Sequence, residues 1–429
     1  MAFITPFKAV RYNKDKIKDL SLVTAPPYDI ISPKMQDELY HINPYNIIRL
    51  ILGKIKKDDS RKENRYTRAR RFFDAWLKAG VMTRDASPAI YIYSQVYKEG
   101  RRPVTRTGFI GLMDLDIDKD ARVLPHENTL AAPKRDRLSL MREVNANLSP
   151  IFVLYEDIRH GIVKTMKAFS AKNRPIININ IDGVSHIVWK MDDVRHIDKI
   201  SAMMENKEIF IADGHHRFET ARNYSIEIQD DKDIPDDVKR DSRYMMVYFV
   251  ESDDRVLSIL PAHRLIKDAG DLTGRDILDR LNRSFSVKRV SALNKLMSGL
   301  ESLSGLHAFG MYMDGGFYIL KLNKLKDSDS AIGDRPMDWK RLDVSILHRF
   351  ILQHVLGIRD EDDNIDFTKN PKEAVSLVDK NKFRIAFFLN PTKVSQVKRI
   401  AKLGERMPRK ATYFYPKPLS GLFINKFGK

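Results

Sequence analysis

The chain has 429 residues, 43% of them hydrophobic, with 75 Lys and Arg against 57 Asp and Glu, a formal net charge of +18 and no Cys. That length is enough for two or three domains with a large core, and the absence of Cys excludes a disulfide framework, a thiolate nucleophile and a Cys-ligated metal. Residues 1–10 lack the apolar segment of a signal peptide, and apolar runs such as 245–250 are too short to span a bilayer. We therefore expect a cytoplasmic protein without a membrane-spanning segment.

The positive charge raises the question of nucleic-acid binding. The Lys and Arg residues are spread along the whole chain among the acidic ones, and no basic tail or run of five like charges is present. This distribution favours a charge-rich solvated surface around a site for an anionic substrate. Nucleic-acid binding is the weaker alternative.

The first fifty residues carry several local signals. Residues 25–33 form a Pro-stiffened segment, after which Ser32 has the character of a helix N-cap with Pro33 as first helical residue. The apolar run 47–52 is expected to be a strand. Asp29, within the Pro-rich segment, is a candidate polar group of a site, and an ordinary turn carboxylate is an equal alternative.

The next segments predict a helix and a hairpin. An apolar stripe of aromatic residues and Leu77 predicts a helix that Gly80 closes. Residues 90–97 alternate as a strand does, and a turn at 99–101 leads to a second strand at 105–112.

A polar motif follows at Pro125-His126-Glu127. The His-Glu-x-x-His pattern of zinc proteases is not completed, so Glu127 is a better candidate for a proton acceptor than for a zinc-site residue. The alternative is that His126 and Glu127 are simply exposed residues of a loop. A basic cluster that includes Lys134 and Arg137 comes next, before an apolar helical pattern, and it could bind phosphate or be solvated.

The chain is organised around residues 208–221, which predict a short strand at 209–211, a turn at Asp213-Gly214 and a helix whose inward face carries Phe218, Ala221 and Ser225. The backbone N–H groups and the dipole at such a helix start favour an anion. The first turn carries His215, His216 and Arg217, and Arg217 could hold a phosphate bidentately.

Two alternatives apply to this first turn. The basic residues could be incidental on a surface helix, although cations at a helix N-terminus oppose the dipole. A metal site at His215 and His216 is disfavoured, because adjacent helical residues point about 100° apart.

The other segments are predicted from the same signals. They are a strand at 151–155, a hairpin of 176–181 and 186–189, an acidic linker at 229–241, a buried strand at 244–250, helices at 275–283 and 291–302, strands at 306–313 and 317–322, a linker at 326–335, an amphipathic helix at 342–351 and a strand at 383–389. His263-Arg264 is a pair of a kind that is more often structural than catalytic. The aromatic and basic tail 407–417 could close a site or dock on the core. We predict three regions: 1–112, 113–325 and 336–429.

Two motifs together point to a known group of proteins. Pro125-His126-Glu127 followed by Asp213-Gly214-His215-His216-Arg217 resembles the ParB/sulfiredoxin-like fold in its free-serine-kinase branch. Over its full length the chain resembles the DUF1015 family, through segments 25–29, 43–45, 126–129, 147–152, 213–217, 260–264 and 407–410. The resemblance implies an α+β (mixed α/β) fold with a ParB/sulfiredoxin-like core and N- and C-terminal additions.

The resemblance also implies an activity. It assigns Glu127 as catalytic base, with Asp213 as a second catalytic residue and Gly214, His215, His216 and Arg217 as nucleotide-phosphate residues. Residues expected to bind substrate or support the site are Asp29, His126, Lys134, Arg137, His263 and Arg264. The implied reaction is transfer of phosphate from ATP or ADP to free L-serine, giving O-phospho-L-serine, with Mg²⁺ brought by the nucleotide rather than by a protein metal motif.

Some features depart from the resemblance. The interval between Glu127 and Asp213 is wider than in compact serine kinases, and Ala411 stands where a Ser is usual. The sulfiredoxin reaction is excluded because it needs a Cys. The alternative function is that of a ParB-like nucleotide- or DNA-binding regulator rather than an enzyme. The lack of a helix-turn-helix pattern argues against it. The expected partners are a nucleotide and a small amino acid; the oligomeric state stays open, and a homo-oligomer is one outcome.

Overall fold

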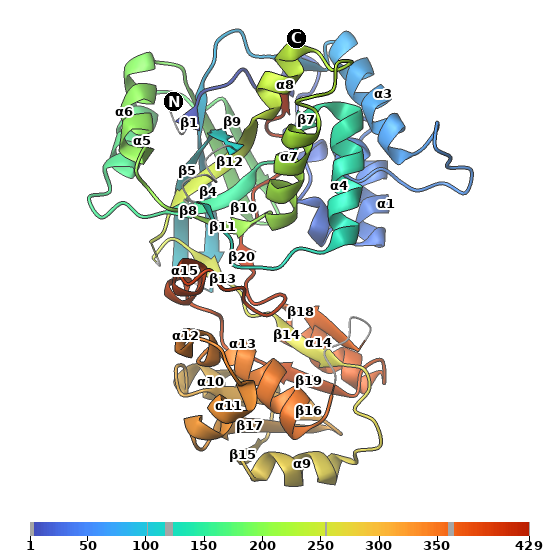
Figure 1. Ribbon diagram of the computed structural model, residues 1–429, viewed down its shortest axis with the longest axis vertical. Coiled ribbons are helices and arrows are strands. Elements are labelled where there is room, and N and C mark those ends of the chain that lie inside the picture. Colours follow the sequence, from blue (N-terminus) through green and yellow to red (C-terminus); the bar gives the residue numbers. More distant parts are fainter. Residues whose placement is uncertain (1–3, 101, 116–122, 254, 359–363, 429) are drawn as a thin grey trace. The chain divides into compact units, whose positions relative to one another are not determined.

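The computed structural model describes residues 4–100, 102–115, 123–253, 255–358 and 364–428 (Figure 1). Its strands and helices alternate through most of this length, so the protein has the mixed α/β fold that the sequence predicts. The chain divides into two compact units: Met1–Pro125, Thr129–Leu257 and Pro416–Lys429 form the first, and His126–Asn128 and Ser258–Tyr415 form the second. The three regions predicted from the sequence are a different division and stay a prediction.

The first unit is built on one mixed sheet in the order β6-β11-β8-β12-β5-β4-β10-β9, with β1 paired to β5. Neighbouring strands are antiparallel except that β11 runs parallel to β6, and β12 parallel to β8. The strands are β1 (Ile4–Thr5), β4 (Ile90–Glu99), β5 (Arg102–Asp114), β6 (Val123–Leu124), β8 (Ile151–Tyr155), β9 (Ile177–Ile181), β10 (Val184–Met191), β11 (Ile209–Asp213) and β12 (Tyr244–Glu251). The predicted hairpins at 90–112 and 176–189 and the strands at 151–155, 209–211 and 244–250 are confirmed.

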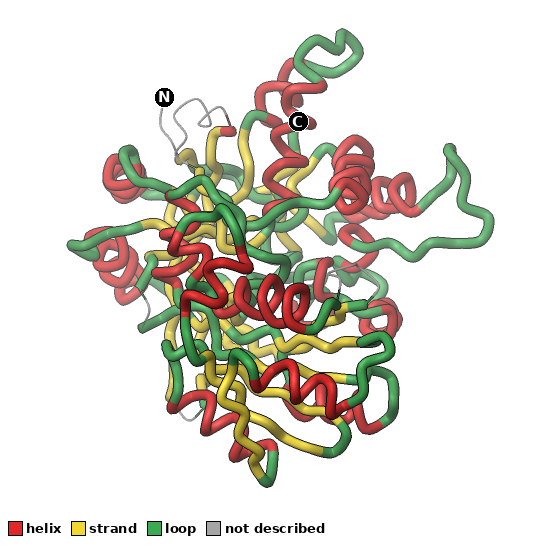
Figure 2. Tube along the Cα trace, turned by 60° about the horizontal axis from the view of Figure 1, so that its bottom comes forward, coloured by secondary structure: helices red, strands yellow, loops and turns green. Residues whose placement is uncertain are grey.

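Helices α5, α6 and α7 pack against the same set of sheet residues, with α4 beside α7; Figure 1 labels these helices, and Figure 2 shows helices (red) around the strands (yellow). The helices of the first unit are α1 (Pro33–Ile42), α2 (Ile48–Ile51), α3 (Arg65–Lys78), α4 (Ala131–Val144), α5 (Gly161–Lys172), α6 (Val194–Met204), α7 (His215–Glu227) and α8 (Asp236–Ser242). Short pairs β2 (Val10–Tyr12) with β3 (Met82–Arg84), and β7 (Ala146–Asn147) with β21 (Asn425–Lys426), complete it. The core holds sheet residues such as Val153 and Phe249 packed with Ile200 and Phe218 from the helices.

Local helix signals are confirmed where a side chain caps the helix. Ser32 accepts the N–H of Met35 at 3.2 Å and Pro33 begins α1, as predicted. The predicted strand at 47–52 is wrong, because this run contains the short helix α2. Asn46 explains the difference: its Oδ1 accepts the Ile48 N–H at 2.9 Å, while its Nδ2 donates to the carbonyl of Leu22 at 2.9 Å. That anchored turn starts a helix within a run whose apolar content alone suits either structure.

Two predicted linkers are also partly helical. The acidic stretch 229–241 contains most of α8, whose first turn carries Asp236 and Asp237, where carboxylates interact favourably with the helix dipole. Residues 326–335 lie largely in α11 (Leu325–Ile332), which packs against a following helix and buries Ser328. The hydroxyl of Ser328 donates to the Leu325 carbonyl at 2.9 Å, so a polar sequence is compatible with this packed helix.

The second unit has an antiparallel sheet in the order β15-β17-β16-β19-β14-β18. The strands of this sheet are β14 (His263–Ile266), β15 (Phe285–Val290), β16 (Ala308–Met313), β17 (Gly316–Leu322), β18 (Ile365–Thr368) and β19 (Ile385–Phe388). The short strands β13 (Ser258–Ile259) and β20 (Phe414–Tyr415) form a separate antiparallel pair. Its other helices are α9 (Gly274–Asn282), α10 (Leu293–Ser302), α12 (Met337–Lys340), α13 (Asp343–Ser345), η4 (Ile346–Val355), α14 (Pro371–Asp379) and α15 (Val394–Lys402). The helices and strands predicted for 275–322 and 383–389 are confirmed, and the amphipathic helix predicted at 342–351 corresponds to α13 and the π-type helix η4.

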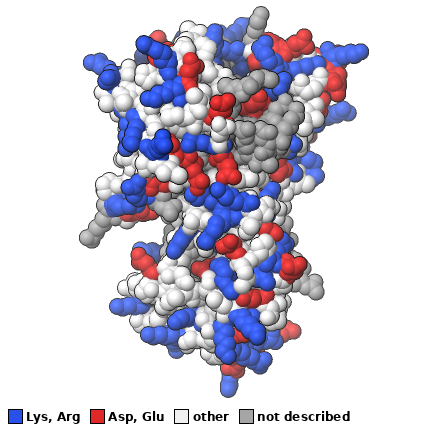
Figure 3. All heavy atoms as spheres, turned by 60° about the vertical axis from the view of Figure 1, so that its left-hand side comes forward, with Lys and Arg blue, Asp and Glu red and all other residues white. Residues whose placement is uncertain are grey.

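The surface carries charges of both signs. On the face drawn in Figure 3, Lys and Arg side chains are interspersed with Asp and Glu. Within the part of the chain that the structure describes, no helix is long and apolar enough to cross a membrane.

Candidate functional site

The central strand–turn–helix predicted from residues 208–221 is confirmed as β11, Gly214 and α7. Gly214 has φ +99°, a conformation that residues with a Cβ rarely adopt. A Cβ at this position would also lie 2.8 Å from Cγ2 of Ile151 and 3.0 Å from Nη2 of Arg217. Glycine is therefore required both for the turn and for the close approach of the Arg217 side chain.

Asp213, the last residue of β11, lies between two cationic side chains. Arg217 donates from Nη2 to Oδ2 of Asp213 at 2.6 Å, and the ammonium of Lys417 forms an ion pair with Oδ1. The other terminal nitrogen of Arg217 donates to the carbonyl of Pro150. Both terminal nitrogens of Arg217 thus have protein acceptors and the side chain holds Asp213, while its role as a phosphate ligand stays a prediction.

Lys417 was missed as a site residue by sequence reasoning. Its side chain is only 8% exposed, and its Nζ lies 3.7 Å from Oδ2 of Asp29 as well as against Asp213. The signal was the aromatic and basic tail 407–417, which was expected either to close a site or to dock on the core. Nothing in the local sequence around Lys417 distinguishes it from the other tail cations.

The sheet positions this lysine through its backbone. Gln95 on β4 donates from Nε2 to the carbonyl of Lys417 at 3.1 Å, and the Arg106 guanidinium on β5 donates to the carbonyl of Pro416. Arg106 is fully buried, donates to Oε1 of Gln95 at 3.2 Å, and stacks 4.7 Å from the ring centroid of Phe152. A buried cation with several acceptors and an aromatic face makes a rigid anchor for the tail.

Asp29 completes a group that we call the Asp213 cluster: Asp29, Asp213, Arg217 and Lys417. Asp29 lies on the 3₁₀ turn η2 (Tyr28–Ile30), and about a third of its side chain is exposed. Burial lowers the pKa of Arg217 below its usual value, while the nearby Asp29 and Tyr28 act in the opposite direction. Asp29 therefore lies beside Lys417, and its role as a site residue stays a prediction.

Other predicted residues surround the start of α7. His215 is buried, and Nε2 of His216 accepts the backbone N–H of Leu130 at 2.9 Å. Lys134 on α4 lies 2.9 Å from Oε2 of Glu219, which also accepts the hydroxyl of Thr129 at 2.7 Å. Burial alone would raise the pKa of Glu219, but these bonds outweigh it and the pKa is lowered. Lys134 thereby joins α4 to α7.

Arg137 forms part of a wall beside the cluster. It donates from Nη1 to the Ile51 carbonyl at 2.6 Å and from Nε to Asp136 at 2.7 Å. Its guanidinium carbon lies 4.1 Å from the ring centroid of Tyr28. Burial raises the pKa of Tyr28, and the charges of Arg137 and Arg217 oppose that effect.

The remaining predicted residues belong to the second unit. His126 is buried, with Nε2 3.0 Å from Oγ1 of Thr412, and the Thr412 hydroxyl donates to Oε1 of Glu127 at 3.4 Å. The backbone also joins these segments, because the Met407 N–H donates to the His126 carbonyl at 2.8 Å. Met407 and Thr412 of the tail therefore contact His126 and Glu127 within the second unit.

His263 and Arg264 have structural surroundings. Burial first, and then the charge of Arg264, lowers the pKa of His263 to about 4. Arg264 donates to Nε2 of His348 at 3.0 Å and to the carbonyls of Arg409 and Lys410 at 3.2 Å. These bonds fit the structural alternative considered for the pair. Among the residues that the structure describes, no group of three or more His, Asp or Glu side chains could hold a metal ion.

The chain is similar to several known proteins. The family model described as "Protein of unknown function (DUF1015)" matches residues 4–345. The chain belongs to the DUF1015 family. A comparison with curated protein sequences gave no match.

Similar solved structures share little sequence with this DUF1015 protein. A conserved hypothetical protein from Pyrococcus furiosus is 13% identical, with a TM-score of 0.35, covering 74% of this chain and 94% of that one. A free serine kinase in complex with AMP is 14% identical, with a TM-score of 0.33 and coverage of 71% and 86%. SbnI with a C-terminal truncation, from Staphylococcus aureus, is 11% identical, with a TM-score of 0.35 and coverage of 72% and 85%.

Proposed function

We propose that this DUF1015 protein is a phosphotransferase that moves a phosphoryl group from a nucleotide, ATP or ADP, to the hydroxyl of a small acceptor, with free L-serine as the first acceptor to test. The observation that carries the proposal is the buried carboxylate of Asp213, held between Arg217 and Lys417 beside the N-terminus of α7. A helix start with a glycine turn presents backbone N–H groups to an anion, and fixed charges around it require little reorganisation during reaction.

The two cations suit phosphate chemistry. Charge on a transferring phosphoryl group must be met by Arg, Lys, backbone N–H groups and a divalent cation. Lys417 and Arg217 are anchored by Asp213, Pro150 and the sheet, so their positions are set before a ligand arrives. A nucleotide phosphate near the start of α7 would exchange part of the Asp213 cluster's internal pairing for contacts to its own oxygens.

The carboxylates of the cluster fit a nucleotide-borne Mg²⁺. Oδ2 of Asp29 and Oδ1 of Asp213 both contact the ammonium of Lys417, so one cation can be near both. Mg²⁺ in nucleotide sites is commonly held by one or two carboxylates and the phosphates, and the ion would neutralise phosphate charge there. Asp29 and Asp213 would hold it once the nucleotide phosphates take over part of their pairing with Lys417 and Arg217.

Glu127 is proposed as the general base on the strength of the motif resemblance. The acceptor hydroxyl is a poor nucleophile, so a carboxylate that takes its proton while the oxygen bonds to phosphorus would help the transfer. Asp213 is less suited to that task, since both of its oxygens already accept from cations. We therefore assign Asp213 to orienting Lys417 and Arg217, and His126 to supporting Glu127 through Thr412.

A regulator of the ParB kind would use the same nucleotide site without transferring phosphate, and the net charge of +18 is the observation in its favour. The two functions differ in product. The deciding experiment incubates the protein with Mg²⁺, ATP or ADP and a panel of amino acids and small alcohols, and looks for phosphorylated acceptors by mass spectrometry.

A matched pair of variants makes this experiment specific. Asp213→Asn removes the buried carboxylate, whereas Asp37→Asn removes an exposed one that pairs with Lys54 on the surface. We expect product with wild type and Asp37→Asn and little with Asp213→Asn. Nucleotide binding without any phosphorylated product would favour the regulator, and absence of both would refute the nucleotide site.

A further inference from the structure

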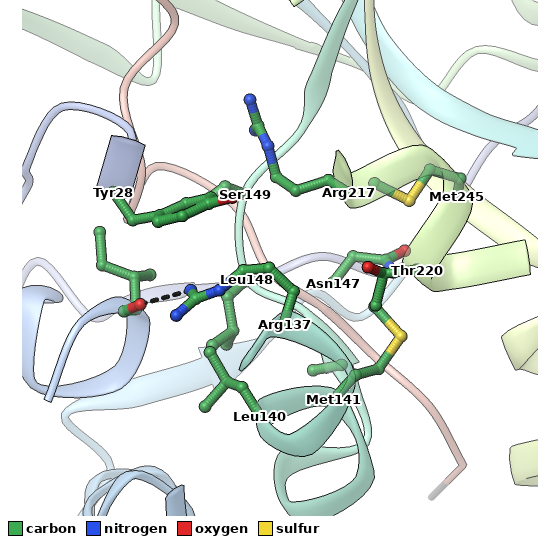
Figure 4. A pocket seen from close by; sticks show the side chains of 12 residues that line it. Tyr28, Arg137, Leu140, Met141, Asn147, Leu148, Ser149, Arg217, Thr220 and Met245 are labelled. Carbon is green, nitrogen blue, oxygen red and sulfur yellow. Dashed lines mark hydrogen bonds between the residues drawn. The ribbon is translucent and has the colours of Figure 1, made fainter. Parts of the chain in front are cut away.

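An apolar pocket lies beside the Asp213 cluster in the first unit (Figure 4). Its walls are Met141 on α4, Leu148, Met245 on β12 and the ring of Tyr28, with the side chains of Arg137 and Arg217 at its sides. Thr220 on α7, Asn147 on β7 and Ser149 also line it and contribute polar side chains. Thr220 lies outside the motifs that suggested the function, and Asn147, the first residue of the matching segment 147–152, had no role assigned to it there.

Two of the polar atoms in this pocket lack a hydrogen-bond partner within the described part of the chain: Oγ1 of Thr220 and Nδ2 of Asn147. Thr220 is 1% exposed and Asn147 is 2% exposed. The other amide atom of Asn147, Oδ1, accepts the backbone N–H of Met246 at 3.0 Å and Nδ2 of Asn425 at 3.2 Å, which fixes the orientation of the side chain. Buried polar groups without partners are costly and rare, so an adjacent pair in one pocket calls for a ligand.

The chemistry of the walls selects an uncharged ligand group. Both guanidinium groups of the pocket already have protein acceptors: Asp136 and the Ile51 carbonyl for Arg137, and Asp213 and the Pro150 carbonyl for Arg217. A phosphate or carboxylate inside the pocket would have to replace one of these acceptors, whereas an uncharged group would leave all of them in place. An uncharged heterocycle, with apolar faces and a polar edge, matches apolar walls, an aromatic ring and two hydrogen-bonding atoms.

The place of the pocket along α7 agrees with a nucleotide. Thr220 follows Arg217 by three residues, so both lie on one side of the helix. Thr220 is six residues beyond Gly214, which corresponds to about 9 Å along the helix axis. A ribose can span that separation between phosphates at the helix start and a base beside Thr220.

We propose that this pocket binds the base of the nucleotide donor, with Thr220 and Asn147 as its hydrogen-bonding residues; the inference rests on the proposed function. The pocket encloses about 50 Å³. A cavity that holds benzene is about 150 Å³, so the base enters by displacing wall side chains. Met141 and Met245 are the lining side chains that can move aside, because an unbranched thioether side chain has several accessible rotamers.

The test compares a nucleotide with a ligand that has phosphates and no base. Binding of ATP and of inorganic tripolyphosphate is measured by calorimetry for wild type, Thr220→Val and Thr220→Ser. Thr220→Val keeps the shape of the side chain but removes its hydroxyl, so we expect ATP to bind about five- to tenfold more weakly, the loss of one hydrogen bond, with tripolyphosphate unchanged. Thr220→Ser keeps the hydroxyl and should bind ATP as wild type does.

A control separates this effect from a general effect of the substitution. Thr165 on α5 is also buried, and its hydroxyl donates to the Gly161 carbonyl at 2.9 Å, away from the pocket. Thr165→Val should leave both affinities unchanged. The melting temperature without ligand should not fall in Thr220→Val, because the hydroxyl removed has no protein partner.

The outcomes are distinguishable. Equal weakening of ATP and tripolyphosphate, or no change of either in Thr220→Val, would overturn the base pocket while leaving the phosphate site intact. Wild type that binds ATP and tripolyphosphate equally well would overturn it too. If wild type binds neither ligand, the proposed function fails and the base pocket fails with it.

Discussion

The side-chain amide of Gln95 donates to the backbone carbonyl of Lys417 at 3.1 Å, across a sequence separation of 322 residues. The contact fixes the C-terminal tail on the central sheet at the residue whose ammonium pairs with Asp213. A site centred on a motif near the middle of the chain thus depends on a lysine twelve residues before its end.

The first prediction concerns Lys417. Lys417→Met leaves Asp29 and Asp213 without their shared cation, and breaking a buried ion pair in this way costs about 3–5 kcal/mol. We expect a loss of that size in the free energy of unfolding, measured with urea. The control, Lys54→Met, breaks an exposed pair with Asp37 and should cost at most about 1 kcal/mol. Equal effects of the two substitutions would show that the Asp213 cluster is not a tightly coupled unit.

The second prediction concerns Arg217. Because its two terminal nitrogens bond to Asp213 and to the Pro150 carbonyl, Arg217→Ala should reduce both stability and ATP affinity, the latter by about 1.5–3 kcal/mol. Arg217→Lys should rescue little, since one ammonium does not reproduce the planar two-point contact. Calorimetry with ATP and ADP on folded variants is the measurement. A folded Arg217→Ala variant with wild-type affinities would contradict the proposed phosphate site.

The third prediction concerns Glu127. If it accepts the hydroxyl proton, it acts in the transition state, so Glu127→Gln should keep nucleotide affinity and lower kcat by about 10²–10⁴-fold. His126→Ala should have a smaller effect, because His126 contacts Thr412 rather than the acceptor in this assignment. Steady-state kinetics with serine and ATP measure both. Near wild-type turnover of Glu127→Gln would move the base to Asp29 or Asp213.

The fourth prediction concerns pH. Burial first, and then the nearby charge of Arg106, lowers the pKa of His186 to about 4, and its Nδ1 lies 2.6 Å from the hydroxyl of Tyr93. In the unfolded chain a His titrates near 6.5, so on acidification the unfolded state takes up the proton first and stability is lost between about pH 6.5 and pH 4. The loss from this one residue is at most about 3 kcal/mol.

Unfolding by urea at pH 7, 5.5 and 4.5 measures this effect. His186→Gln keeps an acceptor for the Tyr93 hydroxyl but cannot be protonated, so its stability should fall less between pH 7 and pH 4.5 than that of wild type. Parallel pH profiles for the two proteins would mean that His186 does not contribute to acid sensitivity. His263, with a pKa also lowered to about 4, is expected to make a similar contribution in the second unit.

Much of the local structure follows from the sequence. The strand before Gly214 and the helix after it are encoded within fourteen residues, by an apolar run, a glycine turn and a helical period. The Ser32 cap and the hairpin turn at Asp182-Gly183 are equally local. Each of these structures is stabilised by residues a few positions apart, so a pattern in a short window can predict it.

Other features depend on contacts between distant segments. The apolar run 47–52 becomes helical because Asn46 bonds to residues more than twenty positions earlier. Arg217 looks like a phosphate ligand in the sequence, yet the carbonyl of Pro150 and the carboxylate of Asp213 orient it inward. In these cases the residue types indicated what kind of bond each side chain can make, but not which distant residue it bonds to.

The sequence by itself determined the family, the mixed α/β class and the strand, glycine and helix at residues 209–227. The tertiary structure alone decided that Lys417 joins Asp213, that Arg106 and Gln95 anchor the tail, and that Thr220 and Asn147 face one pocket. The physical reason is that a buried charge or amide is placed by the packing of whole elements. Sequence separation sets no limit on which partners that packing brings within hydrogen-bonding distance.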